Sequence, residues 1–300
     1  MFGGIHAATV TPMRADGSLD EKQARSQVEF LRGQGTVVGY LVNGHAGESP
    51  YLSLEEQVAN LRVYREVHPE ATITCGICVE DPRTAIRNVA ELARAGAHAV
   101  LLFPPWSLAG AGGIPALKAF CRSVCEASPL PVVLYKPAYF SAQAIPVEDM
   151  VELAGLPEVA AIKDGSWEVV EFEQVKLGIS RAGLDVAVLG SSDEHFFYNY
   201  LSGNVGCQAS MVTILPEPIA RMIALIESGD VAAARKIHQK LAPIARYIYR
   251  SGSGADMVAR LKLGLAVRGV IDEPHFRVPR VPVKSDEVTT MREMIGSIDF

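Results

Sequence analysis

The feature that most constrains this chain is a regular alternation of short apolar runs with longer amphipathic segments. Eight runs are rich in β-branched residues and show little polar alternation, which is typical of strands buried on both faces of a parallel sheet. They cover Ile5–Thr11, Val37–Val42, Ile73–Val79, Ala99–Phe103, Val132–Tyr135, Val159–Lys163, Val186–Leu189 and Val205–Ser210. Helical patterns follow these runs, and two of them begin with clear N-cap residues, Ser53 and Asp81. Eight such units predict an α/β protein with a closed (β/α)8 barrel, the TIM-barrel fold.

The predicted barrel ends near residue 215 and so occupies residues 1–215 of the 300. The rest of the chain, residues 216–300, contains three further helical patterns and a proline-rich break. The patterns cover Pro218–Ser228, Val231–Tyr249 and Ala255–Val267, and the break covers Pro274–Pro282. We expect this region to form a helical C-terminal extension packed on the barrel. A nucleotide-binding doubly wound sheet is disfavoured, because neither a G-x-G-x-x-G after the first run nor a G-x-x-x-x-G-K-[ST] is present.

Charge and cysteine content restrict the partners and the compartment. The net charge is −6 and the pI is about 5.7. No long block of like charges occurs, so no basic stripe could neutralise nucleic-acid phosphates. The five cysteines do not suggest a disulfide framework, and the odd spacing of Cys75 and Cys78 within a strand-like run would send their sulfurs to opposite faces. We predict buried thiols, a reducing cytoplasmic location and no nucleic-acid partner.

Neither the N-terminus nor the longest uncharged stretch predicts a targeting or membrane element. The N-terminus, Met1–His6, has no basic region or cleavage pattern, so it predicts no signal peptide. The uncharged stretch Ala95–Leu117 is long enough to span a bilayer, but Pro104 and Pro105 and three later glycines break it. We predict a buried strand followed by a loop, and no membrane association.

The candidate catalytic residues lie where the strand-like runs end, because barrel enzymes place their chemistry there. Lys163 ends a run that must be buried, and a desolvated lysine amine has a lowered pKa and can attack a carbonyl carbon. A lysine that simply reaches solvent is the alternative, and Lys136 is a rival, although strand alternation lets only Lys136 or the adjacent Tyr135 face the interior. Tyr135 is either a proton relay or a core aromatic, and His45 is either an acid/base group or a loop residue. No H-x-x-x-H or H-E-x-x-H pairing is present, so we predict no metal site.

Three pieces of the sequence together resemble the dihydrodipicolinate synthase / N-acetylneuraminate lyase superfamily. They are Gly44-His-Ala-Gly-Glu48, Tyr135 and Ile162-Lys163, and the resemblance extends from Gly4 to the helical C-terminus. It implies class I aldolase chemistry, in which Lys163 forms a Schiff base with the keto carbon of pyruvate or another 2-keto acid and Tyr135 relays protons. It also implies a lyase that needs no metal or nucleotide cofactor, and a homotetramer built as a dimer of dimers.

The resemblance further implies that the turn after the second strand binds the substrate carboxylate. Backbone N–H groups between Gly44 and Gly47 would hold that carboxylate, and Glu48 would hold the turn itself. Most members of the superfamily carry two hydroxyl residues between these glycines, one linking the tyrosine relay and one helping to hold the carboxylate. This chain has His45 and Ala46 instead.

The proton relay also departs from the family pattern. A tyrosine usual in the fourth strand-end loop is replaced by Trp106, so the relay would consist of Tyr135, His45 and Trp106. Tryptophan is a donor only and cannot pass a proton on. We therefore hypothesise that His45 takes over as the acid/base group.

Other residues near the predicted site restrict the choice of substrate. The synthase carries an arginine shortly after the strand-5 tyrosine to hold a second carboxylate, and Tyr135–Ser141 has none. This disfavours dihydrodipicolinate synthesis. Asp193, Glu194 and Ser210 instead resemble the positions with which N-acetylneuraminate lyase and sugar-acid enzymes hold hydroxyl groups.

Two departures disfavour sialic acid itself: Ser191 stands where a glycine is usual, and Gly165 where a hydroxyl residue is usual. We expect Ser191 in the substrate site, and as substrate a 2-keto-3-deoxy sugar acid or another hydroxylated or aromatic 2-keto acid facing Trp106. Aldol cleavage and dehydration both remain open. The alternatives are dihydrodipicolinate synthase proper, a non-catalytic family member that binds a keto acid, and a flavin- or phosphate-binding barrel, which Gly203–Gly206 supports only weakly.

Overall fold

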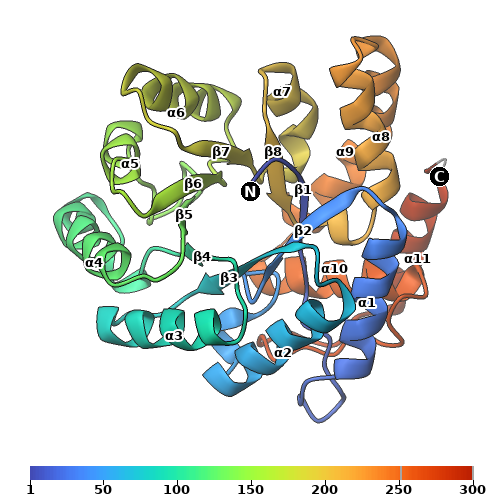
Figure 1. The fold of residues 1–300 in the computed structure, drawn as a ribbon. Coiled ribbons are helices and arrows are strands. Elements are labelled where there is room, and N and C mark those ends of the chain that lie inside the picture. Colours follow the sequence, from blue (N-terminus) through green and yellow to red (C-terminus); the bar gives the residue numbers. More distant parts are fainter. Residues whose placement is uncertain (251, 299–300) are drawn as a thin grey trace.

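The computed structural model describes residues 1–250 and 252–298. At its centre, eight parallel strands form a closed barrel in which each strand pairs with its sequence neighbour and β8 pairs with β1 (Figure 1). The strands are β1 (Gly4–Ala8), β2 (Val37–Val42), β3 (Thr72–Ile77), β4 (Ala99–Leu102), β5 (Val132–Lys136), β6 (Val159–Asp164), β7 (Ala187–Gly190) and β8 (Gly206–Ala209). The predicted (β/α)8 barrel is therefore confirmed.

Helices alternate with the strands and form a ring around the barrel (Figure 1). They are α1 (Glu21–Gly33), α2 (Leu54–Val67), α3 (Pro82–Arg94), α4 (Ile114–Glu126), α5 (Val147–Ala154), α6 (Val169–Arg181), α7 (Phe196–Leu201) and α8 (Pro216–Glu227). Three more helices gather on the side where α1 and α8 lie (Figure 1). They are α9 (Val231–Arg250), α10 (Gly254–Val267) and α11 (Ser285–Gly296).

The apolar runs are explained by two separate apolar layers. Successive side chains of a strand point to opposite faces. In β2, Leu41 joins a cluster inside the barrel with Leu101 and Val133, whereas Tyr40 and Val42 join the larger cluster between barrel and helices. Because both faces are apolar, the strands show no polar alternation in sequence.

The two predicted helix starts are present. The Ser53 side chain accepts from the N–H of Glu56 while the Glu56 side chain accepts from the N–H of Ser53, a capping box. The Asp81 carboxylate accepts from the first-turn N–H groups of α3.

The uncharged stretch at residues 95–117 contains β4, two short 3-10 turns and the start of α4, as the strand-and-loop interpretation predicts. No helix in the described part of the chain is long and apolar enough to cross a membrane. All five cysteines are free thiols; Cys121 and Cys125 lie on the buried side of α4.

Ion pairs fasten the C-terminal helices to one another and to the barrel. Arg280 pairs with Asp256 of α10 and Glu287 of α11, and Arg268 pairs with Glu217 of α8. The division of the chain at residue 215 stays a prediction. Helix α8 follows that boundary directly and packs against α7 as the last helix of the ring. Residues 251 and 299–300 of the expected extension lie outside the described residues.

Candidate active site

Strands β5 and β6 bring the two central candidate residues to the same level of the barrel. Tyr135 is in register with Lys163, and both side chains line a cavity of about 110 Å3. The next register pair is Lys136 and Asp164, and Lys136 forms an ion pair of 2.7 Å with Glu171 of α6. Because successive side chains alternate, Lys163 is the lysine that faces the barrel interior and Lys136 faces the helices.

Eight of the residues predicted from the sequence line this cavity together. They are Gly44, His45, Ala46, Tyr135, Lys163, Ser191, Asp193 and Ser210. The other lining residues are Ala8, Thr9, Leu41, Trp167, Tyr249 and Met257. Strand ends from both sides of the barrel and two helices of the C-terminal region therefore share one small cavity.

Lys163 is an enclosed amine, with 8% of its surface exposed. Burial lowers the pKa of Lys163 to about 8, and the nearby Asp193 charge partly opposes this effect. At pH 8 about half of such amines are neutral, compared with below about 1% for an ordinary lysine. Burial also raises the pKa of Asp193 to about 6, and its Oδ1 accepts the N–H of Met211 at 2.6 Å. The cavity therefore holds an amine that is readily available in its nucleophilic form.

An aromatic cluster surrounds the amine. His45 stacks on Phe103 with ring centroids 3.9 Å apart and meets Tyr135 edge-on at 5.5 Å. Burial, and secondly the Lys163 charge, lower the pKa of His45 to about 4, so its imidazole is neutral near pH 7 and has one donor and one acceptor nitrogen. Burial raises the pKa of Tyr135, which keeps its hydroxyl protonated. Both side chains can therefore donate and accept a proton beside Lys163.

Gly165 makes room for the Tyr135 hydroxyl. A Cβ at position 165 would lie 2.6 Å from that oxygen, closer than real Cβ contacts come. A hydroxyl residue at this position would therefore displace the phenol. The departure from the family pattern at Gly165 thus has a packing reason.

The turn after β2 presents adjacent backbone amides that are available to a ligand. Asn43 and Glu48 adopt left-handed backbone conformations, with φ of 54° and 57°, and flank the turn. The N–H groups of Ala46 and Gly47 donate to no described residue. A Cβ on Gly47 would lie 3.1 Å from the Asn43 nitrogen, so the tight turn needs glycine there. Such a pair of adjacent amides is suited to a carboxylate.

Glu48 connects this turn to the C-terminal helices. Its carboxylate and the Lys262 ammonium of α10 are both fully buried and lie 2.5 Å apart. The second carboxylate oxygen accepts the N–H groups of Arg277 and Val278, each at 2.8 Å. The contacts are structural, because Glu48 does not line the cavity.

Three further candidate residues do not line the cavity: Gly47, which lies in the turn after β2, Trp106 and Glu194. Trp106 lies in a 3-10 turn after β4, is 61% exposed, and donates its backbone N–H to Glu80. Glu194 forms an ion pair of 2.6 Å with Arg250 of α9. Neither side chain lines the cavity.

Of the six lining residues that the sequence did not predict, three carry large side chains from outside the strands. Trp167 lies just beyond the end of β6. An aromatic residue four positions after Lys163 is a sequence signal for a side chain that lines the cavity. Tyr249 and Met257 come from α9 and α10, and no spacing or motif connects these helices to the lysine.

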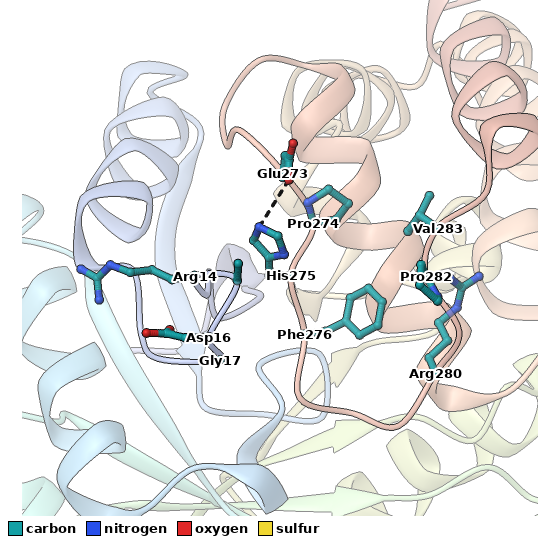
Figure 2. A pocket seen from close by; sticks show the side chains of 11 residues that line it. Arg14, Asp16, Gly17, Glu273, Pro274, His275, Phe276, Arg280, Pro282 and Val283 are labelled. Atoms are coloured by element: carbon teal, nitrogen blue, oxygen red, sulfur yellow. Dashed lines mark ion pairs between the residues drawn. The ribbon is translucent and has the colours of Figure 1, made fainter.

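A larger depression of about 510 Å3 lies away from these residues, between the β1–α1 loop and the segment before α11 (Figure 2). Its lining charges already have partners: Arg14 donates to Ser18, and Glu273 pairs with His275 at 3.4 Å. It contains none of the predicted site residues. Nowhere in the described chain do three or more His, Cys, Asp or Glu side chains form a group that could hold a metal ion.

The fold and the enclosed lysine define the class: a (β/α)8-barrel protein with an amine at the centre of its mouth. Comparison with known proteins then identifies the family. Residues 1–298 match the model of the dihydrodipicolinate synthetase family. The chain belongs to this family, and it is an enzyme of the lyase class.

Individual relatives agree with this assignment. The chain is 30% identical over 285 residues to a 4-hydroxy-tetrahydrodipicolinate synthase of Bifidobacterium longum, covering 93% of this chain and 89% of that protein. It is 30% identical to the enzyme of the same name from Acidothermus cellulolyticus, covering 100% and 93%. Among solved structures, dihydrodipicolinate synthase DapA-2 of Bacillus anthracis has a TM-score of 0.90 at 26% identity, covering 100% of this chain and 99% of the other. YagE of Escherichia coli K12, solved in complex with pyruvate, has a TM-score of 0.90 at 23% identity, covering 99% and 98%.

Proposed function

We propose that the chain is a Schiff-base-forming lyase that acts on a 2-keto acid through a pyruvate-type intermediate. The observation that carries this proposal is the enclosed Lys163 amine, in register with Tyr135 inside one cavity. The two available amides at Ala46 and Gly47 lie in the turn that lines the same cavity, so they supply a place for the carboxylate next to the keto group.

The covalent steps follow from this arrangement. The neutral Lys163 amine attacks the keto carbon, the keto oxygen leaves as water, and an iminium forms. In aldol cleavage the 4-hydroxyl loses its proton, the C3–C4 bond breaks, and its electron pair moves toward the iminium nitrogen to give an enamine and a free aldehyde. In dehydration a C3 proton and the 4-hydroxyl leave together as water, and hydrolysis of the resulting unsaturated iminium releases the product and restores the lysine. In cleavage, protonation of the enamine at C3 and hydrolysis then release pyruvate and restore the lysine.

Tyr135 and His45 carry the protons in this proposal. Both side chains are neutral and line the cavity beside the amine, and their rings contact each other. Trp106 is left out, because its exposed side chain lies outside the cavity.

The substrate we favour is a 2-keto-3-deoxy sugar acid or a related hydroxylated 2-keto acid. Asp193, Ser191 and Ser210 offer acceptors and donors for its hydroxyl groups. Lys163 is the one cationic side chain among the described lining residues, so none is left to hold a second carboxylate. This favours a sugar acid over the dicarboxylic product of the synthases that the chain resembles.

Reduction of the Schiff base tests the proposal directly. The protein is incubated with pyruvate and borohydride, and the intact mass and tryptic peptides are measured, with Lys163→Arg as the control. We expect one reduced adduct per chain, on Lys163, and none in the control. Absence of an adduct in the wild-type protein would refute the Schiff-base chemistry. An adduct without turnover on any 2-keto-3-deoxy acid would instead support the non-catalytic keto-acid-binding alternative.

We also propose a cytoplasmic homotetramer built as a dimer of dimers. The free cysteines suit a reducing compartment, and the exposed aromatic rings of Trp106 and Phe140, each 61% exposed, suit burial against another copy. Light scattering after size exclusion tests the stoichiometry, and a monomer at micromolar concentration would contradict it.

A further inference from the structure

Resting on the Schiff-base function proposed above, we propose that Trp167 is the specificity-determining residue of this cavity. Together with Tyr249 it forms a wall that admits a short, uncharged, hydroxylated leaving aldehyde. Longer or anionic leaving groups are excluded.

The backbone fixes the Trp167 ring at the cavity. Its φ is 59°, a left-handed conformation that bulky residues seldom adopt and that is found where surrounding contacts hold it. The Trp167 N–H donates to the Ser192 hydroxyl at 3.1 Å. The preceding residue, Ser166, is held by Asp164, whose Oδ1 accepts both its N–H and its hydroxyl. The segment leaving the end of β6 is thus held on two sides.

A charged group supports the ring from behind. The Arg250 guanidinium lies 4.8 Å from the Trp167 ring centroid and 5.7 Å from that of Phe140. Glu194 holds this guanidinium: its carboxylate accepts from Arg250 Nε at 2.6 Å and also lies 3.8 Å from Arg246 Nε. Glu194 therefore acts here as a positioning residue: it keeps Arg250 in place behind the indole.

This wall presents one buried polar group to the cavity, the Tyr249 hydroxyl. The Tyr249 ring lies 5.2 Å from the Trp167 ring, centroid to centroid. Its buried hydroxyl faces the Asp193 carboxylate and the Ser210 hydroxyl, but the geometry of these contacts falls short of a full hydrogen bond. A buried hydroxyl whose own contacts are incomplete is costly, and a substrate hydroxyl would complete its hydrogen bonding. The C–H face of the same substrate chain would pack on the indole.

The size and charge of the leaving aldehyde that the cavity admits follow from these positions. The cavity of about 110 Å3 is well below the roughly 300–1,000 Å3 of sites for drug-sized ligands. Asp193 lines the cavity, so an anionic tail would meet a like charge there, and no lining side chain other than Lys163 offers a counter-charge. The structure assigns the site to monocarboxylic 2-keto acids whose leaving aldehyde is small.

The test compares two substrates that differ in the length of the leaving aldehyde, 2-keto-3-deoxypentonate and 2-keto-3-deoxyoctonate. The variants are Trp167→Ala and Trp167→Phe, and Val170→Ala is the matched control, because its exposed side chain lies in the same segment outside the cavity. We expect Trp167→Ala to raise the ratio of kcat/KM for the octonate over the pentonate by about tenfold or more. Trp167→Phe should raise it less, and Val170→Ala should leave it unchanged. An unchanged ratio in a Trp167→Ala protein that still forms the borohydride adduct would overturn the proposal.

A second measurement covers the case in which Trp167→Ala does not fold. The sequence has two tryptophans, Trp106 and Trp167, so a Trp106→Phe variant reports the emission of Trp167 alone. Combined with Lys163→Arg, which blocks reaction, this variant should show a saturable change of emission with the pentonate. No change, in a protein that binds the pentonate by calorimetry, would also overturn the proposal. Failure of the wild-type adduct would refute the Schiff-base function itself, a separate outcome.

Discussion

Replacing Lys262 by methionine tests the buried connection between the carboxylate-binding turn and helix α10. The Lys262 ammonium donates to Glu48 at 2.5 Å and to the His275 carbonyl at 2.7 Å, and both charged side chains are fully buried. Methionine keeps the apolar stem but leaves the Glu48 carboxylate buried with only the two backbone N–H groups of the segment after α10. An uncompensated buried charge of this kind costs about 3–5 kcal/mol.

That loss can be measured as a change in the free energy of unfolding. For a chain of this size each kcal/mol lowers the melting temperature by roughly 2–4 °C, so the Lys262→Met protein should melt about 10 °C lower. Urea unfolding gives the free energy, and far-ultraviolet dichroism gives the melting temperature. Lys118→Met is the control, because Lys118 also pairs with two carboxylates but near the surface, and its loss should cost below about 1 kcal/mol.

The double variant Glu48→Gln/Lys262→Met distinguishes the energy of the ion pair from the energy of side-chain packing. Because it removes both charges, it should lose less than the sum of the two single variants, with a coupling of about 2 kcal/mol or more. The turn should also move in Lys262→Met, which raises the pyruvate concentration needed for half-maximal borohydride trapping. If Lys262→Met lost less than about 1 kcal/mol, or if the single losses simply added, the reasoning would be refuted.

Three further predictions concern the chemistry. Because deprotonation makes the Lys163 amine nucleophilic, the trapping rate should rise with pH through about 8 and then level off, and a rise that continued toward 10.5 would contradict the lowered pKa of Lys163. Gly165→Ala should lower kcat about a hundredfold while the melting temperature changes little, since its Cβ would displace the Tyr135 hydroxyl. His45→Ala should lower kcat about a hundredfold if the imidazole moves protons, as steady-state kinetics would show, and an intact turnover would remove His45 from the relay.

The barrel and its central residues could be predicted because they follow from local patterns. Strand alternation allowed only one of Tyr135 and Lys136 to face the interior, and the structure puts Tyr135 in register with Lys163 there. The helix starts at Ser53 and Asp81 are also local, since each depends on a side chain and the first turn that follows it. Family resemblance then pointed to the turn at Gly44 and to the residues after β7.

The wall formed by Trp167 and Tyr249 could not be predicted, because it depends on contacts between segments far apart in sequence. The resemblance placed Glu194 on substrate hydroxyls, whereas its carboxylate pairs with Arg250 at the end of α9. That pairing exists only once α9 has docked on the barrel. The same docking brings Tyr249 to the cavity, and neither the helical period nor the spacing of α9 indicates which turn reaches the mouth.

The C-terminal helices are therefore part of the candidate site as well as a support for it. Tyr249 from α9 and Met257 from α10 line the cavity, while Lys262 of α10 fixes the turn that offers the carboxylate amides. Because one helix carries both Met257 and Lys262, a shift of α10 would change the lining of the cavity and the turn together. Substitutions at the α10 contacts should thus alter keto-acid binding and leaving-group selection jointly, whereas a change confined to Trp167 should alter selection alone. This difference separates a residue that selects the substrate from a helix that holds the whole site.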